Sequence, residues 1–413
     1  MSSNELIKSK IDEYFDQTVS WRTYLHENPE VSDKEYETAK YLKNECEKLG
    51  LLVEDAANTT GFTALLDTGR PGKTLGIRTD IDALPIHESE YNKKFKKSVI
   101  SKNDGVSHAC GHDSHMATLL TTAKILTDLK DEINGKIYFI FEEGEETGGG
   151  IEAMVDHLRD KGLDACYGNH QASFLEVGEI RVIKGPSHAG CAGVEFDVIG
   201  KGGHGSRPDL CINPLTATAN IVTALTTAWV NQLDVNETVT FGLGSINGGA
   251  ASNVIPDKCN VKGTLRFFDD KAGKDALEVL KEVTEATAKA HKCEVEFSDY
   301  TRIVAYPTIN DPDLAEEVIK SLNDIYPGAY RDGKPTFGSE SFFGYSRLCP
   351  SVYTKFGVRD EENGITASAH TPEFDLNPEG IKYAVGLQVK FATDFLGEAN
   401  DWFKKYNSWL WRI

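Results

Sequence analysis

Several features that would point to particular classes of protein are scarce or missing in this 413-residue chain. It contains no Cys-x-x-Cys pair and its eight cysteines are scattered, so neither a zinc knuckle nor a disulfide framework is expected. No apolar run approaches the roughly 20 residues that span a bilayer, and residues 1–16 lack the apolar segment of a secretory signal. These absences predict a cytoplasmic location, where a reducing environment would protect a metal-ligating thiol.

Basic residues are also in short supply. The chain has 44 lysines and arginines against 64 aspartates and glutamates, which gives a formal net charge of −20 at pH 7. This excess of negative charge argues against nucleic acids and anionic membrane surfaces as partners. The length exceeds what one ordinary hydrophobic core needs, so two domains are expected.

The densest group of reactive side chains has the sequence Ser-His-Ala-Cys-Gly-His-Asp-Ser-His, over residues 107–115. Cys110 and His112 flank a glycine, a spacing that can aim a thiolate and an imidazole at one point. Residues 116–126 predict an apolar helix, which places the cluster at a loop-to-helix junction. Thiolate, imidazole and carboxylate ligands together suit zinc and its transition-metal neighbours rather than calcium.

A second group follows residues 136–141, a short apolar run that predicts a buried strand. Glu145 and Glu146 come shortly after it, and ligands in open α/β sheets collect at such strand ends. Adjacent carboxylates repel each other unless a positive charge lies beside them, and a metal ion supplies that charge. One carboxylate could then bind the ion while the other accepts a proton from water. A solvated acidic turn is the alternative for such a pair taken alone.

Two further histidines extend the pattern. His170 follows residues 164–167, which predict a short strand, and His370 lies in a polar loop near the C-terminus. Either histidine alone would more often be an ordinary surface or core residue. The joint pattern favours a metal site.

The order of predicted strands and helices divides the chain. Strands and helices alternate up to about residue 184, which is typical of a three-layer α/β domain with a largely parallel sheet. Residues 194–297 predict the order β-α-β-β-α-β, the ferredoxin-like arrangement, and the α/β pattern then resumes. We therefore expect a discontinuous metal-binding domain, residues 1–186 and 301–413, interrupted by an inserted domain, residues 187–300.

Taken in order, these motifs resemble the metal-dependent amidohydrolases of the M20 peptidase group, in the branch of aminoacylases, hippurate hydrolases and indoleacetyl-amino-acid hydrolases. The resemblance runs almost from end to end, and the ordered set is highly specific. Its segments are Trp21–Glu30, Arg78–Pro85, His108–Asp113, Glu145–Glu146, Gly168–His170, Gly200–Gly205, Asn253–Asp257, Gly263–Arg266, Gly338–Glu340 and His370. It implies that residues 1–186 and 301–413 form a metallopeptidase-like α/β/α catalytic domain and that residues 187–300 form an inserted ferredoxin-like lid or dimerisation domain.

The resemblance also implies a divalent metal cofactor, one or two ions per subunit, with zinc expected first and manganese, cobalt or nickel as alternatives. The implied metal ligands are Cys110 as a bridge between two ions, His112 and His170 on one ion, and Glu146 and His370 on the other. Glu145 would be the general base and later the acid.

Other residues would serve the substrate. The resemblance implies that His204 stabilises the oxyanion, reaching across from the second subunit of a homodimer, and that Asn253 and Arg266 hold a substrate carboxylate. Asp80 and Asp82 would lie near the metals without binding them. The glycine-rich segment around His204 would be a flexible loop, and its spacing does not fit a phosphate-binding loop, which excludes nucleotide binding.

The chain departs from the family pattern in places. Glu142-Glu143-Gly144 stands where Gln-Pro-Ala is common, and Ser341 stands where an aspartate is usual. The added negative charge could alter the affinity for metal or the pKa of the base. Residues 400–413, which hold three of the five tryptophans, match no family feature and could form a packing extension or an oligomer contact.

The resulting prediction is metal-dependent hydrolysis of the amide bond of N-acyl amino acids, which are small-molecule substrates. A dipeptidase or carboxypeptidase that acts on short peptides is the alternative with the same chemistry. A non-catalytic metal- or ligand-binding homologue is a remote third.

Overall fold

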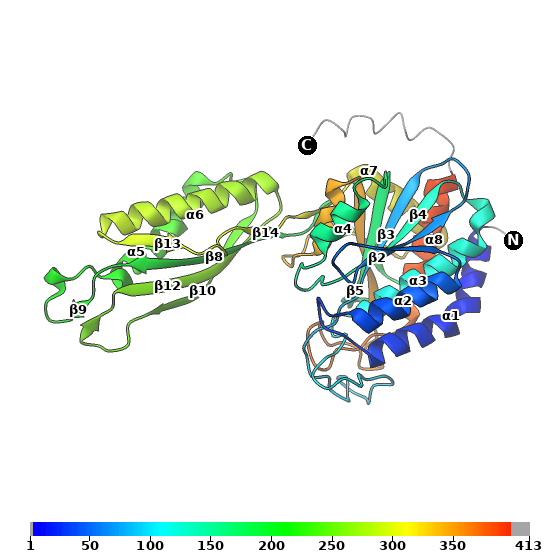
Figure 1. Ribbon diagram of the computed structural model, residues 1–413, viewed down its shortest axis with the longest axis horizontal. Coiled ribbons are helices and arrows are strands. Elements are labelled where there is room, and N and C mark those ends of the chain that lie inside the picture. Colours follow the sequence, from blue (N-terminus) through cyan, green and yellow to red (C-terminus); the bar gives the residue numbers. More distant parts are fainter. Residues whose placement is uncertain (1–2, 398–413) are drawn as a thin grey trace. The chain divides into compact units, whose positions relative to one another are not determined.

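The computed structural model describes residues 3–397, and the chain divides into two compact units (Figure 1). The first unit comprises the chain up to Gly185, Ile309–Lys334 and the residues from Gly344 onward; the second comprises Pro186–Thr308 and Pro335–Phe343. Residues 301–308 and 335–343 therefore belong to the second unit, whereas the sequence-based division gave them to the catalytic domain. The tryptophan-rich residues 400–413 lie outside the described residues.

An eight-stranded sheet forms the centre of the first unit, in the order β1-β2-β4-β3-β5-β17-β6-β16. Its strands are β1 (Leu52–Asp55), β2 (Phe62–Asp67), β3 (Thr74–Asp80), β4 (Lys136–Glu142), β5 (Ala165–Glu176), β6 (Ile180–Val182), β16 (Tyr330–Arg331) and β17 (Ser351–Arg359). The four central neighbours β4, β3, β5 and β17 run parallel. Parallel strands bring their carboxyl ends to one edge, where ligands of such sheets bind.

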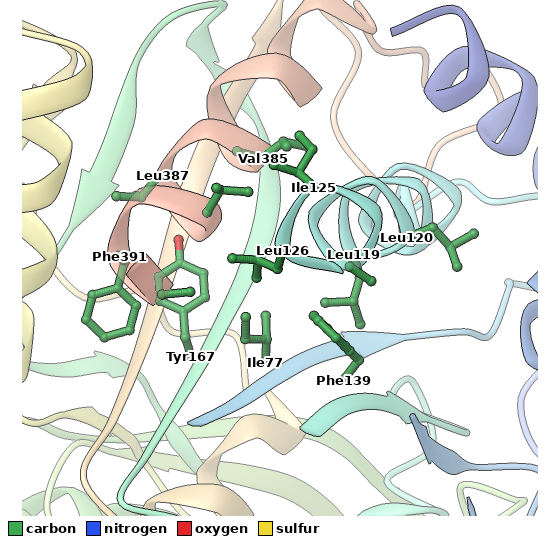
Figure 2. Packing of buried hydrophobic residues seen from close by; sticks show 14 of the residues in the cluster. Ile77, Leu119, Leu120, Ile125, Leu126, Phe139, Tyr167, Val385, Leu387 and Phe391 are labelled. Carbon is green, nitrogen blue, oxygen red and sulfur yellow. The ribbon is translucent and has the colours of Figure 1, made fainter. Parts of the chain in front are cut away.

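Helices cover both faces of this sheet. They are α1 (Ser3–Glu27), α2 (Tyr36–Lys48), α3 (His112–Asp128), α4 (Ile151–Leu158), α7 (Pro312–Ile325) and α8 (Glu379–Gly397), with the short 3-10 helices η1 (Lys130–Glu132) and η3 (Ser341–Arg347). Figure 2 shows side chains of α3 and α8 packed over Ile77, Phe139 and Tyr167 of three parallel strands. On the opposite face, His157 of α4 lies 3.1 Å from the Thr63 hydroxyl of β2. The predicted three-layer α/β/α architecture is confirmed.

The second unit is built on an antiparallel sheet in the order β10-β12-β8-β13, with β14 also paired to β8. Its elements are β8 (Gly190–Ile199), α5 (Pro214–Gln232), β10 (Val239–Gly248), β12 (Lys258–Phe267), α6 (Asp270–Ala290), β13 (Glu294–Phe297) and β14 (Ile303–Ala305). Smaller elements are β7 (Gly185–His188), β9 (Gly203–His204), η2 (Pro208–Leu210), β11 (Val254–Ile255) and β15 (Thr308–Asn310). The first six elements have the β-α-β-β-α-β order that the sequence predicts.

Local sequence explains the helices of the second unit. Asn213 accepts hydrogen bonds from the amides of Leu215 and Thr216 at the start of α5, and a proline follows it at the first helical position. Asp269 caps α6 in the same way. Alternate residues of β8 are apolar and fully buried, so one face of the sheet packs against both helices.

One difference between the predicted and observed strands affects the site. β5 runs to Glu176, well beyond the short segment expected at residues 164–167. It is prolonged because β17 pairs with it in parallel as far as Ala172. His170 consequently lies inside a strand and not at its end.

No helix among residues 3–397 combines the length and apolar character that crossing a bilayer requires.

Candidate metal centre and active site

The cysteine and first histidine of the 107–115 cluster are held by a sharp turn at the start of α3. Gly111, between them, has φ +82°, a left-handed conformation that favours glycine. A Cβ atom there would lie 2.7 Å from Cγ of Gln171. The turn therefore needs glycine both for its backbone angle and for its close contact with β5.

Five side chains from four segments of the first unit converge beside this turn. Two groups have ligand atoms within 4.8 Å of one another: Cys110, His112 and His170, and Cys110, Glu146 and His370. The thiol sulfur is 3.3 Å from Nε2 of His170 and 3.3 Å from Nε2 of His370. Cysteine and histidine on one tetrahedral zinc ion are separated by about 3.5 Å, given Zn–S and Zn–N bonds of about 2.3 and 2.0 Å. These separations are close to those expected if Cys110, His170 and His370 held metal together.

The polar atoms of this cluster also fit a metal. Nε2 of His112 is buried, has no hydrogen-bond partner, and lies 3.9 Å from a carboxylate oxygen of Glu146. An unsatisfied buried nitrogen is unfavourable, and a bound cation would satisfy it. Burial raises the pKa of the Cys110 thiol. A metal ion would stabilise the thiolate that ligation requires.

Asp82 orients two of these ligands. Its Oδ1 accepts a hydrogen bond from Nδ1 of His112 at 3.0 Å, and its Oδ2 accepts from the amide of Glu146 at 3.0 Å. The Ser32 hydroxyl donates to the same Oδ2. Burial alone would raise the pKa of Asp82, but the His112 hydrogen bond and charge outweigh it and lower that pKa. A proton held on Nδ1 leaves Nε2 of His112 as the metal-binding nitrogen.

The other two histidines are positioned through the backbone. Nδ1 of His170 lies 2.6 Å from the carbonyl oxygen of Gln171, which leaves Nε2 toward Cys110. His370 has φ +63°, an uncommon left-handed conformation for a residue with a side chain, and its amide donates to the Ala109 carbonyl. Strained backbone of this kind clusters at functional sites.

Asp80 lies 3.8 Å from Nδ1 of His112 but makes its hydrogen bonds to two other residues. Its Oδ1 accepts a 2.7 Å hydrogen bond from Nδ1 of His115, and its Oδ2 accepts one from Arg78. Nε2 of His115 in turn accepts from the amide of Gln171, whose side chain donates to the Cys110 carbonyl. Asp80, His112 and His115 also come close enough to hold an ion. Both nitrogens of His115 are already hydrogen-bonded, so this group supports the ligands.

Sequence reasoning gave His115 no role, although its three-residue spacing from His112 on a helix was a usable signal. The sequence also indicated no role for Trp21–Glu30, the first segment of the family resemblance. Arg22 and His26 of α1 donate to Oδ2 of Asp113 at 2.7 and 2.9 Å. This buried network fixes the first turn of α3 next to the metal ligands.

The two glutamate pairs after β4 have different surroundings. Gly144, with φ +60°, turns the chain so that Glu145 and Glu146 each place a carboxylate oxygen near His112. Glu142 instead accepts from Nε of Arg78 at 2.9 Å and from the Tyr345 hydroxyl. Glu143 accepts from the hydroxyl and the amide of Thr60. The extra negative charges of this chain are therefore engaged by donors in the core of the first unit.

The remaining predicted residues belong to the second unit. His204 forms β9, which pairs with Val254 of β11, so the glycine-rich segment is tethered by strand pairing. The amide of Ser206 donates to Nδ1 of His204, which leaves the proton on Nε2. The carbonyl of the neighbouring Asn253 accepts from the amide of Gly205. The side chain of His204 is exposed and available as a donor.

Arg266 lies apart from His204 and Asn253 within the same unit. β9 and β11 adjoin the Lys258 end of β12, because the amide of Gly200 bonds to the carbonyl of Asp257. Arg266 lies eight residues along that strand, a distance of about 26 Å at 3.3 Å per residue. Its guanidinium donates to the Ser339 hydroxyl at 2.7 Å. One copy of this unit does not bring the predicted carboxylate-binding pair together.

Comparison with known proteins agrees with this fold and site. The model of peptidase family M20/M25/M40 matches residues 76–394. The chain is 33% identical over 397 residues to thermostable carboxypeptidase 2 of Saccharolobus solfataricus, which covers 95% of this chain and 98% of that protein. It is 36% identical over 296 residues to an N-acyl-L-amino acid amidohydrolase of Geobacillus stearothermophilus, with 71% and 79% covered.

A solved structure extends the agreement to the fold. The crystal structure of a dinuclear metal-binding peptidase of the M20 family from Bacillus subtilis superposes with a TM-score of 0.80 at 27% identity, over 93% of this chain and 99% of that one. The α/β/α unit with its ligand cluster is that of a hydrolase of the amidohydrolase class. The chain belongs to the M20 peptidase family, and the resemblance noted in its sequence is confirmed.

Proposed function

We propose that this enzyme hydrolyses the amide bond of N-acyl amino acids, with Glu145 as the general base. The observation that carries the proposal is the cluster of metal ligands that converges on Cys110, with a Glu145 carboxylate oxygen within 4.8 Å of ligand atoms of His112 and Glu146. The relatedness to an N-acyl-L-amino acid amidohydrolase supports the same class of substrate.

The residues of the first unit would perform the proton transfers. A divalent metal held by the five ligands would polarise the amide carbonyl and acidify a water molecule. Glu145 would accept the proton of that water on a carboxylate oxygen and later deliver it to the nitrogen of the leaving amine. Asp82 and Asp80 would keep the histidines of the cluster in the orientation that this chemistry needs. Zinc is our first candidate for the metal.

The residues of the second unit would bind and polarise the substrate. Nε2–H of His204 is suited to donate to the oxyanion, a contribution of about 3–4 kcal/mol for one such donor. Arg266 would pair with the carboxylate of the amino acid in fork geometry. We accordingly propose that this unit acts as the lid of the active site.

We further propose a homodimer in which the second copy supplies His204 together with Asn253. Lys258 and Arg266, at the two ends of β12, lie about 26 Å apart within one unit. Asn253 and Arg266 can meet at one substrate only if they come from different copies. The exposed edge strand β10 offers a surface for that association, since its unpaired backbone groups invite another strand. We propose the cytoplasm as its location, where Cys110 would stay reduced.

A panel of substrates tests the proposal. N-acetyl, N-benzoyl and N-indoleacetyl amino acids are assayed beside matched dipeptides, with protein stripped by a chelator and reloaded with zinc, manganese or cobalt. We expect metal-restored release of free amino acid from at least one acyl series. Cleavage confined to dipeptides would establish the peptidase alternative instead. Stoichiometric metal binding without any turnover would contradict both.

A further inference from the structure

A row of cations crosses the sheet of the first unit, beginning beside a metal ligand. His170 of β5 is the register partner of Lys355 of β17, Lys355 is the partner of Arg181 of β6, and Arg181 is the partner of Arg331 of β16. Cross-strand partners share one face of a sheet, and like charges placed directly opposite destabilise it. Three adjacent cations in a chain of net charge −20 therefore call for a function.

The two arginines of this row are held differently. Arg331 forms an ion pair with Glu179 at 2.8 Å and donates to two backbone carbonyls. Arg181 has no ion pair within residues 3–397, and its buried Nε has no hydrogen-bond partner. A Cβ atom at position 333 would lie 2.7 Å from that Nε, so Gly333 leaves it the necessary space. Of the two arginines, Arg181 is therefore the one that can bind an external anion.

A bulge in β5 places an aromatic ring against these cations. Ala172 pairs with Gly357 and Glu176 pairs with Arg359, so three residues of β5 oppose the single residue 358 of β17. The bulge projects Phe174, whose side chain is half exposed. Its ring centroid is 4.8 Å from Cζ of Arg181 and 5.9 Å from Nζ of Lys355. Bulges near active sites commonly re-aim a side chain in this way.

We propose that Arg181 and Lys355 bind a carboxylate at the far end of the acyl group, so that the preferred substrates are monoamides of dicarboxylic acids, such as N-succinyl or N-glutaryl amino acids. The inference rests on the proposed function, because it extends the acyl chain from an amide held at the metal ligands. Lys355 and Arg181 are one and two strand spacings from His170, or about 5 and 10 Å. Their side chains can reach back toward a short dicarboxylic chain.

Each residue contributes a different part of this subsite. The planar guanidinium of Arg181, stacked on the ring of Phe174, is preorganised for a two-pronged contact with a carboxylate. Lys355 adds a second positive charge nearer to the metal ligands. The exposed part of the Phe174 ring would cover the methylene groups of the acyl chain. The local positive charge would also offset the repulsion between a dianionic substrate and an acidic protein.

The test compares kcat/KM for an N-succinyl and an N-acetyl derivative of the same amino acid, on the metal-loaded enzyme. We expect wild type to favour the succinyl substrate, and Arg181→Gln to lower the succinyl-to-acetyl ratio roughly tenfold, as loss of a charged hydrogen bond does. Arg331→Gln is the matched control, since it removes the same charge one strand farther out and should leave the ratio unchanged. Arg181→Lys should recover part of the preference.

A second variant keeps the inference testable if the Arg181→Gln protein does not fold. Phe174→Leu alters an exposed side chain and should lower the same ratio while the thermal unfolding midpoint stays near that of wild type. Titration calorimetry with free glutarate gives a readout apart from turnover, and its heat should be lost in Arg181→Gln. Equal succinyl-to-acetyl ratios in wild type, Arg181→Gln and Phe174→Leu would overturn the inference. Hydrolysis of the N-acetyl substrate in the same experiment would still support the proposed function. Absence of all N-acyl hydrolysis would overturn both.

Discussion

The candidate site residues of the two units differ in exposure. In the first unit, His112 and Asp82 are buried and Nδ1 of His112 is hydrogen-bonded to Asp82, although the side chain of His370 is half exposed. In the second, His204 and Asn253 are exposed on a short strand and its adjoining turn. If the proposed function is right, burial preorganises the metal-binding side chains of the first unit. The proposed substrate-binding residues of the second unit would instead be covered only by a substrate or a second copy.

The largest effect is expected at Glu145. Glu145→Gln should lower kcat by about 10²–10⁴-fold, because the amide cannot accept the proton. Metal content, measured by mass spectrometry after dialysis, should stay at the wild-type level, since the five proposed ligands are untouched.

Glu143→Gln is the control for Glu145→Gln. It removes a carboxylate two residues away, and its oxygen can still accept from Thr60. Its kcat should stay near that of wild type. The base would have to be another group if Glu145→Gln turned over normally.

A smaller effect is expected in the second unit. Arg266→Gln should lower kcat/KM by about 10–100-fold, the range for loss of a hydrogen bond to a charged group. The metal content and the unfolding midpoint should not change, because Arg266 bonds only to the exposed Ser339 among the described residues. A loss of metal in this variant would contradict the proposal that the first unit alone binds the metal. An amide analogue of the substrate, without the carboxylate, should show no difference between wild type and variant.

Much of this organisation could be predicted from the sequence, because the signals are local. The order of strands and helices gives both units, and the spacing within residues 107–115 gives two of the five residues that converge. The partners of those residues could not be predicted in the same way. His115 reaches Asp80 across 35 positions and Arg22 reaches Asp113 across 91, distances in sequence that only the packed fold brings together.

The effect of the extra glutamates also needed the structure. Glu142 and Glu143 precede the Glu145–Glu146 pair by a few residues, so the sequence suggests that their charge acts on the metal or the base. Gly144 turns the chain between the two glutamate pairs. Glu142 is then paired with Arg78, and Glu143 accepts a hydrogen bond from Thr60. The positions of Asn253 and Arg266 near opposite ends of β12 were likewise not predictable from the sequence, where the two residues are only 13 positions apart.

The turn that joins Cys110 to His112 offers a test of stability in the first unit. Gly111→Ala should lower the free energy of unfolding by about 1–3 kcal/mol, because a side chain at φ +82° is strained and its Cβ would meet Gln171. Urea denaturation measures the change, and metal affinity should fall with it. Gly105→Ala is the matched control, since Gly105 has φ +78° but nothing within 4 Å of a Cβ. Equal losses in the two variants would mean that contact with β5 contributes nothing.

The last effect is seen only in the pH dependence of stability, and it also belongs to the first unit. Burial raises the pKa of Glu35 from 4.5 to about 7, while its hydrogen bond from the Gly144 amide opposes that rise. The folded protein then holds a proton that the unfolded chain releases near pH 4.5, so this group makes stability fall as the pH rises from about 4.5 to 7. Glu35→Gln should remove about 3 kcal/mol of that decline, measured by urea denaturation at several pH values. Glu37→Gln, on the exposed face of α2, should leave the decline as it is in wild type. If both variants kept the wild-type dependence on pH, the Glu35 carboxyl would already be ionised in the folded protein well below pH 7. The buried residues around Gly144 would then accommodate its negative charge.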